Sequence, residues 1–127
     1  MTDDGLERRH YKSGEVIFAQ GETGTEAFIV ESGRVEVSYG ARNAEVVLAL
    51  IQPGDLVGEM ALLDSAPRMA TARARGKTTC VVVPKRVFDR VLKDGSPVLV
   101  AVLKTLLKRL RKESSDAARS TLGPKTP

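Results

Sequence analysis

The chain has 127 residues, of which 42% are apolar and 4% aromatic, with no tryptophan. This length fits one domain with a modest aliphatic core and excludes two full domains. Charged residues make up 28% of the chain and mean hydropathy is −0.14, so the composition excludes a membrane-embedded or a disordered protein. Residues 1–66 carry 5 basic and 12 acidic side chains, whereas residues 67–127 carry 15 and 4. The basic second part needs an explanation.

The N-terminus, the apolar runs and the single cysteine indicate the compartment. The first residues are acidic and lack the apolar core of a secretory signal. The longest aliphatic run, residues 98–103, is far shorter than the ~20 residues that span a bilayer. Cys80 has no second cysteine to pair with and stands in an apolar run, which is typical of a buried thiol in reducing surroundings. We therefore expect a cytoplasmic protein without a transmembrane segment.

Short strands broken by turn residues are predicted between Gly14 and Pro84. Apolar and polar side chains alternate over residues 35–39, and short apolar runs occupy residues 28–30 and 46–51. The spacing of turn residues suits an all-β sandwich, roll or barrel, of which a β-roll is the simplest. These turn pairs are Ser32-Gly33, Tyr39-Gly40, Pro53-Gly54 and Gly76-Lys77.

After Pro84 the apolar period becomes helical. Val87, Phe88, Val91 and Leu92 share one helical face that ends near Asp94-Gly95, where Gly95 can adopt the left-handed C-terminal conformation. Ser96 as N-cap and Pro97 at the first helical position predict a second helix that runs to about Glu113.

The second predicted helix has a leucine face and a basic face. The leucines are expected to form core or a dimer seam, and the basic side is most simply a solvated surface. Residues 114–127 are polar and are expected to form a flexible tail. The leucines are Leu99, Leu103, Leu106, Leu107 and Leu110, and the basic residues are Lys104, Lys108, Arg109, Arg111 and Lys112.

The motif that carries chemistry lies within residues 54–74. Gly58 precedes residues 59–63, which are long enough for one helical turn. A glycine there lets a ligand approach the backbone, and the first amide N–H groups of the turn form a ready phosphate site. Arg68 follows Pro67 on an extended segment, and its planar guanidinium can bind two phosphate oxygens. Glu59 would repel an anion, so its carboxylate indicates either a ligand hydroxyl, such as that of a ribose, or a contact that steadies Arg68.

Residues 12–113 resemble the cyclic nucleotide-binding domain family. The most specific matches, residues 58–63 and Pro67-Arg68, resemble its phosphate-binding cassette. The resemblance implies an eight-stranded antiparallel β-roll, jelly-roll-like, over about 12–84, with a short cassette helix and C-terminal helices over about 85–113. Residues 1–113 would form one mainly β domain with α. Further matches are residues 14–18, Gly21-Glu22, residues 28–33 and residues 52–55.

The resemblance also implies a ligand and a site. Arg68 would pair with the cyclic phosphate and Glu59 would accept the ribose 2′-hydroxyl. Aliphatic side chains of the roll would pack on the sugar and base, and the final helix would cover the base, with Lys108, Arg111 and Ser114 as capping positions. The implied ligand-binding residues are Gly58, Glu59, Met60, Ala61, Arg68, Met69, Ala70, Val37, Leu48 and Ile51.

Two positions depart from the family pattern. Val57 stands where the family often has phenylalanine, which removes one packing contact. Met69 stands where a small residue is usual and where cGMP-preferring members carry threonine or serine. Because methionine cannot bond the guanine amino group, the pattern favours cAMP as the ligand over cGMP. It implies no cofactor.

Other readings of the same residues remain open. Glu59 and Arg68 could form a structural ion pair between helix and strand. His10 is the only histidine, so the several-histidine metal site of a cupin is not expected. Cys80 has no candidate base and no nucleophile elbow occurs, so an enzyme is not expected.

The partners are less defined than the ligand. One alternative is a roll that has lost nucleotide binding and docks an effector through its basic last helix, at Lys108 and Arg109. A weaker alternative is a protein that binds polyanions or membrane surfaces in a salt-dependent way. A homodimer through the last helix is a further expectation, and specific DNA binding by this chain alone is not expected because no DNA-reading element follows that helix.

Overall fold

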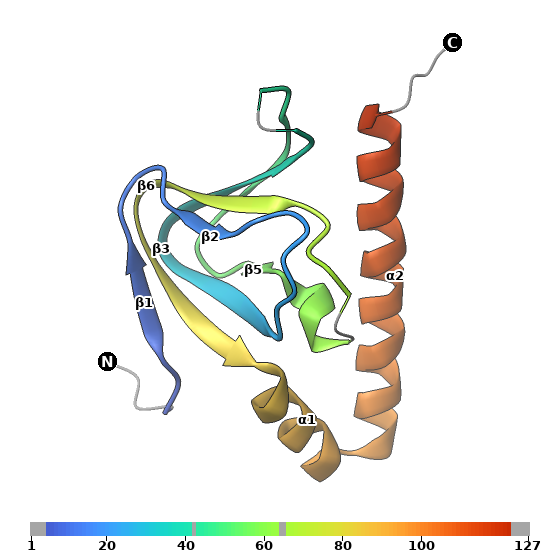
Figure 1. The fold of residues 1–127 in the computed structure, drawn as a ribbon. Helices are drawn as coiled ribbons and strands as arrows, with labels where there is room; N and C mark the ends of the chain where they lie inside the picture. The colour runs from blue at the N-terminus through green and yellow to red at the C-terminus, as the bar shows by residue number, and fades with distance from the viewer. Residues whose placement is uncertain (1–4, 42, 64–65, 123–127) are drawn as a thin grey trace.

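The computed structural model describes residues 5–41, 43–63 and 66–122. An antiparallel sheet curls into a roll, α1 follows it, and α2 runs along the side of the roll opposite β1 (Figure 1). The elements are β1 (Arg8–Tyr11), β2 (Val16–Phe18), β3 (Glu26–Tyr39), β4 (Val46–Ile51), β5 (Leu56–Val57), the 3₁₀ helix η1 (Glu59–Leu62), β6 (Thr71–Pro84), α1 (Lys85–Asp94) and α2 (Pro97–Leu122).

The roll is organised around the ladder between the two longest strands, β3 and β6. β1 pairs with the second part of β6, where Arg8 lies opposite Val81, and β2 pairs with its first part, where Val16 lies opposite Arg73. In the same way, β5 pairs with the first part of β3 and β4 pairs with its second part. The ladder therefore contributes to both layers of the roll, and the core lies between them.

The implied count of eight strands is wrong, because the described residues form six strands in a sheet that does not close. Ser32-Gly33 and Gly76-Lys77, predicted as turns, lie inside β3 and β6. The register shifts on both sides of Ser32, and Gly33 and Gly76 have φ values of 84° and 74°. The buried Thr78 hydroxyl oxygen accepts the Arg34 amide at 3.3 Å, so the main chain is satisfied where the strands bend. These two glycine-containing pairs therefore bend the long strands and do not end them.

The core is aliphatic around two aromatic rings. Phe18 and Phe28 stack with ring centroids 6.0 Å apart. Val57 is buried in the same cluster, so the smaller side chain at this position is a core residue. Burial raises the pKa of the Cys80 thiol to about 11, as expected for an inert core cysteine. The cluster comprises Phe18, Phe28, Val30, Val35, Val57, Ala72, Cys80 and Val82.

The helices begin where the sequence predicts but differ at their ends. α1 ends at Asp94, yet Gly95 is extended with φ −87° and ψ 167°, not left-handed, because the chain must enter α2 almost at once. α2 begins at Pro97 and continues past Glu113 to Leu122, through a segment that contains good helix formers. The part of the predicted tail up to Leu122 is therefore helical, and residues 123–127 lie outside the described residues. Neither described helix has the length and apolarity needed to cross a membrane.

The leucine face of α2 divides between two directions. Leu107 is buried and Leu103 half-buried on a helix that contacts β4 and η1. Leu99 and Leu106 are 64% and 53% exposed. The helix therefore has a packed side against the roll and an open apolar side, and the side chain of Leu110 lies outside the described residues.

Candidate functional site

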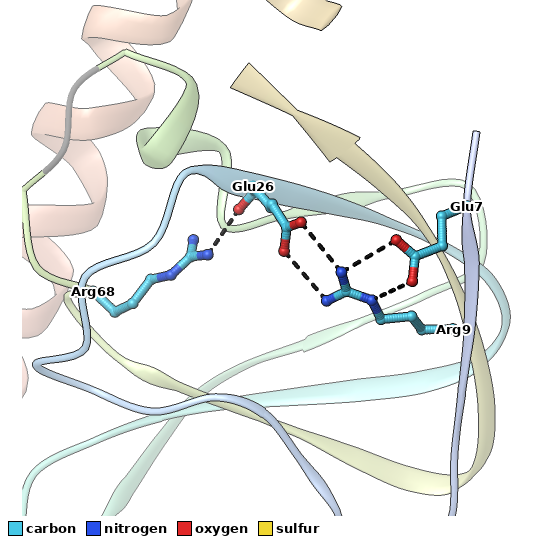
Figure 2. A network of polar contacts seen from close by, with 4 residues as sticks. All are labelled: Glu7, Arg9, Glu26 and Arg68. Atoms are coloured by element: carbon cyan, nitrogen blue, oxygen red, sulfur yellow. Dashed lines mark hydrogen bonds and ion pairs between the residues drawn. The ribbon is translucent and has the colours of Figure 1, made fainter. Parts of the chain in front are cut away.

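Arg68 is the most enclosed charged side chain in this region, only 9% exposed. Its Nη2 donates to the main-chain carbonyl of Glu26 at 2.8 Å, as Figure 2 shows, and its Nη1 donates to the carbonyl of Gly58 at 3.4 Å. The guanidinium carbon lies 4.1 Å from the centroid of the Phe18 ring. Carbonyl oxygens and an aromatic face therefore hold the cation in place.

The backbone of Arg68 is fixed by the loop between β2 and β3. Its amide donates to the Glu22 carbonyl at 2.7 Å, and its carbonyl accepts the Gly21 amide at 2.9 Å. These two bonds join the segment before β6 to that loop. The starting point of the side chain is thus set by main-chain contacts from both sides.

Two glycines make room for the guanidinium. A Cβ at Gly58 would lie 2.9 Å from both Arg68 Nη1 and a Phe18 ring carbon, and Gly58 has φ 76° just before η1. A Cβ at Gly24 would lie 2.5 to 2.9 Å from the Arg68 guanidinium atoms. A side chain at either position would therefore displace the guanidinium, and at Gly58 it would also meet the Phe18 ring on a left-handed backbone that favours glycine.

The two carboxylates whose charges act on Arg68, those of Glu22 and Glu26, accept hydrogen bonds from other residues. Burial lowers the pKa of Arg68 from its usual value, and the charges of Glu26 and Glu22 oppose that shift. Glu22 accepts the Ala19 amide at 2.9 Å, and both carboxylate oxygens of Glu26 accept from Arg9 at 3.2 Å. Within the described part of the chain, Arg68 is a buried cation that makes no ion pair.

Glu59 opens η1 and is half-buried. Burial raises the pKa of its carboxyl above the usual value, and only its own backbone amide opposes the shift. No ion pair in the described residues joins Glu59 to Arg68, so the structural-pair reading of these two residues is not realised. The carboxylate is desolvated and lacks a cationic partner there.

The other predicted cassette residues lie on the same two segments. Met60 and Ala61 are in η1, and the Ala61 amide already donates to the Gly58 carbonyl at 3.2 Å. Met69 is half-buried and Ala70 buried on the chain between Arg68 and β6. The Gly58 to Arg68 contact brings these segments together.

The predicted aliphatic residues lie on β3 and β4. Val37 and Ile51 pack against the core cluster that contains Phe18, and so connect to Arg68 through that ring. Val37 lies opposite Ala49 and the next pair is Ser38 with Val47, which leaves Leu48 as the extra, half-buried residue of a bulge.

The predicted capping positions lie on α2. Lys108 is exposed and lines a groove of about 540 Å³ together with Leu62 and Leu63 at the end of η1. The side chains of Arg111 and Ser114 lie outside the described residues. The helix therefore reaches the cassette, but only the first capping position can be placed.

The residues that surround Arg68 were not predicted from the sequence. They are Phe18 in β2, Glu22 and Gly24 in the following loop, and Glu26 at the start of β3. The Gly21-Glu22 pair was a signal that this loop matters. Carbonyl partners and ring contacts leave no signature in residue types.

Comparison with known proteins shows the family of this chain. The cyclic nucleotide-binding domain profile matches residues 8–94. The cAMP-dependent protein kinase regulatory subunit of Mycosarcoma maydis is 42% identical over 94 residues, covering 70% of this chain and 18% of that protein. The HTH-type transcriptional regulator Cmr of Mycobacterium tuberculosis is 28% identical over 105 residues, covering 83% of this chain and 43% of that protein.

Solved structures give the same result. The Thermus thermophilus catabolite activator protein superposes with a TM-score of 0.72 at 33% identity, covering 87% of this chain and 53% of that one. The EAL enzyme Bd1971 matches in a cGMP-bound form at 0.73 and 30% identity and in a cAMP-bound form at 0.70 and 29%; each match covers 30% of that chain and 87% or 86% of this one. The chain spans only 18% to 22% of the kinase regulatory subunits that it matches. By sequence and by fold, this chain belongs to the cyclic nucleotide-binding domain family.

Proposed function

We propose that this domain is a sensor that binds cAMP, with Arg68 pairing with the cyclic phosphate. The observation that supports it is the state of Arg68, which is 9% exposed and makes no ion pair within the described residues. Burying a guanidinium is costly unless an anion neutralises it. A cyclic phosphate has one negative charge and two exocyclic oxygens, which suit the planar fork of arginine.

Glu59 is proposed to accept the ribose 2′-hydroxyl. A half-buried carboxylate without a cationic partner gains from a neutral hydroxyl donor, whereas it would repel the phosphate. The amides of Gly58, Met60 and Ala61 are proposed to add contacts to the phosphate or ribose, with the Ala61 amide exchanging its bond to Gly58 for the ligand.

The remaining proposed ligand contacts come from both sides of the roll. Val37, Leu48 and Ile51 would pack on the sugar and base, and Met69 and Ala70 would line the cassette side. Met69 supports cAMP over cGMP because its thioether cannot donate or strongly accept a bond at the guanine amino group. Relatives solved with cAMP and with cGMP have both been matched, so the choice rests on this residue.

Signalling is proposed to pass through α2. This helix contacts both η1 and β4, so it touches the cassette and the strand that would face the base. A ligand that binds better when α2 covers the base shifts the population toward that position. The role is regulatory and not catalytic, and a cytoplasmic location is part of the proposal because the single cysteine is a buried thiol.

The open side of α2 is proposed to pair with the same face of a second copy. Leu99, Val102 and Leu106 follow the spacing of one helical stripe and are 64%, 51% and 53% exposed. Analytical ultracentrifugation should give a dimer that dissociates in the Leu99→Glu, Leu106→Glu variant. A wild-type monomer at micromolar concentration would contradict the pairing.

The function is tested by calorimetric titration of the purified chain with cAMP and cGMP, with Arg68→Leu as the negative control. We expect saturable binding of cAMP, weaker binding of cGMP and near-complete loss in the variant. A partner that is captured through Lys108 and Arg109 regardless of nucleotide, together with no heat from either nucleotide, would favour the docking-module alternative.

A further inference from the structure

A row of alternating charges leads from β1 to the guanidinium of Arg68. Figure 2 shows its members, Glu7, Arg9, Glu26 and Arg68. Arg9 Nε lies 2.7 Å from a Glu7 oxygen and its Nη2 lies 3.2 Å from the other. Its two terminal nitrogens each lie 3.2 Å from one oxygen of Glu26. Arg9 therefore occupies both oxygens of the Glu26 carboxylate.

Glu26 contacts two arginines, one through its main-chain carbonyl and the other through its carboxylate. Its main-chain carbonyl accepts from Arg68 at 2.8 Å, while its side chain turns toward Arg9 (Figure 2). The carboxylate charge nevertheless acts on Arg68. A free carboxylate next to a buried guanidinium would form a strong bidentate pair with it. Such a pair would occupy the same donors that a phosphate needs.

We propose that Arg9 is a positioning residue that holds the Glu26 carboxylate away from Arg68 and so keeps the Arg68 guanidinium open to an anion. Its consequence for nucleotide affinity rests on the proposed function of the site. Glu22 is kept from Arg68 in a simpler way, by the Ala19 amide at 2.9 Å. Each carboxylate whose charge reaches Arg68 thus has another donor.

The ion pairs of Arg9 are expected to contribute little to the stability of the fold. The Arg9 and Glu26 side chains are 36% and 31% exposed, and ion pairs this open add little to stability. Glu7 also pairs with the Arg9 guanidinium, so Arg9 adds no net positive charge beside the proposed phosphate site. The Arg9 guanidinium also lies 5.9 Å from the centroid of the Phe28 ring, so removing Arg9 should cost a small amount of stability, and its larger expected effect is on affinity.

The test is a cycle of Arg9→Gln, Glu26→Gln and the double variant, titrated with cAMP. Arg9→Gln frees the carboxylate to pair with Arg68, and we expect it to weaken binding about tenfold. Glu26→Gln keeps the carbonyl and removes the competitor, so affinity should stay within about twofold or rise. The double variant should bind like Glu26→Gln. A second mutation that restores affinity cannot come from additive structural damage.

Arg8→Gln is the matched control. Arg8 is the neighbour of Arg9 on β1 and pairs with Glu31 of β3 at 3.1 Å, away from Arg68. It should lose as much thermal stability as Arg9→Gln while affinity stays within about twofold. Unchanged cAMP affinity in Arg9→Gln, or a double variant that binds cAMP more weakly than Arg9→Gln, would overturn the proposed role of Arg9.

A nucleotide-free measurement separates this inference from the proposed function. The Arg68 guanidinium lies over the Phe18 ring, so we expect the ring to shift its Nε–H proton and nitrogen signals, which their loss in Arg68→Lys would identify. We expect the signals to move in Arg9→Gln and return in the double variant. If the Arg68 signals stay in place in Arg9→Gln, the proposed role of Arg9 is refuted even if no nucleotide binds. If the signals move as expected but the protein binds no nucleotide, the role of Arg9 is supported and the cAMP proposal is refuted.

Discussion

Arg68 and Arg73 lie five positions apart on one segment of the chain, yet their surroundings are opposite. Arg73 Nη1 pairs with the Glu45 carboxylate at 2.8 Å, and its side chain is 32% exposed. Arg75, two residues further, pairs with Glu36. Arg68 is 9% exposed and bonded to two carbonyls and a ring face. The strand arginines form ion pairs within the fold, whereas the cassette arginine forms none with the described residues.

We infer from this contrast that the strand arginines serve the stability of the fold, whereas Arg68 serves the proposed binding. A half-exposed ion pair contributes at most about 1 kcal/mol, and its partners are satisfied without a ligand. A buried guanidinium that makes only neutral contacts lowers the stability of the free protein and gains most when an anion arrives. The energetic cost of Arg68 in the free state is therefore the source of affinity in the proposed complex.

The largest effect is expected from removing the two arginines separately. Arg68→Leu loses the charged bonds to phosphate and should weaken cAMP binding by about 100-fold or more. Arg73→Leu breaks only the pair to Glu45 and should leave affinity within about twofold. Calorimetry gives the affinities, and circular dichroism should show both variants folded. Equal losses in the two variants would erase the distinction between them.

Crowding the guanidinium should give the next largest effect. In Gly58→Ala the new methyl group meets Arg68 and Phe18 at 2.9 Å on a backbone with φ 76°, so we expect a loss of about 1 to 3 kcal/mol in unfolding free energy and about tenfold in affinity. Gly54→Ala is the control, because Gly54 has φ 94° but nothing within 4 Å. It should lose stability from strain alone and keep its affinity. Denaturant unfolding and titration separate the two losses.

Glu59→Gln tests the second charged residue of the cassette. Affinity for cAMP should fall about tenfold, while 2′-deoxy-cAMP, which lacks the hydroxyl, should bind wild type and variant alike. A deoxy ligand that is equally sensitive to the substitution would place Glu59 away from the ribose.

The same residue predicts a pH dependence with opposite signs for folding and binding. The pKa of Glu59 is raised in the folded state, so the folded protein holds this proton at a higher pH than the unfolded chain, whose glutamates titrate at about 4.3. Lowering the pH through the raised pKa should stabilise the free protein and weaken cAMP binding, because the acceptor is lost. Glu59→Gln should remove both effects in paired unfolding and titration series. Binding that improves on acidification in wild type alone would contradict the assignment.

The smallest effect is expected at Met69. Met69→Thr supplies a hydroxyl for the guanine amino group and should raise cGMP affinity about fivefold, as one neutral hydrogen bond of ~1 kcal/mol would. Met69→Ala removes bulk without adding a polar group. Competition titrations with both nucleotides should show the gain in the threonine variant only, and an equal gain in both variants would assign it to pocket size.

Local features of the fold were predictable from the sequence because they depend on nearby residues. The turn after Gly58 and the start of α2 at Pro97 follow from the glycine and the proline at these positions. The bends at Gly33 and Gly76 were misread because a glycine pair has the same signature in a turn and in a bent strand. Only long-range pairing between β3 and β6 decides between them.

The residue types of Arg68 and Glu59 made them candidates from the sequence, and the resemblance to the family implied their roles. The surroundings of Arg68 had no such signal. The contact of Arg68 with the Glu26 carbonyl spans 42 positions and uses a main-chain atom, which no residue pattern reveals. Arg9 reaches Glu26 only because β1 and β3 both lie against β6. These contacts come from the topology of the roll.

One calorimetric experiment decides whether Arg68, buried and without an ion pair among the described residues, is the receptor for a cyclic phosphate. Wild type and Arg68→Leu are titrated with cAMP under the same conditions, after circular dichroism has shown that both are folded. We predict one saturable site per chain in wild type and loss of that site in the variant. No binding to wild type at millimolar cAMP, or equal binding to both proteins, would show that Arg68 is not the receptor for the phosphate.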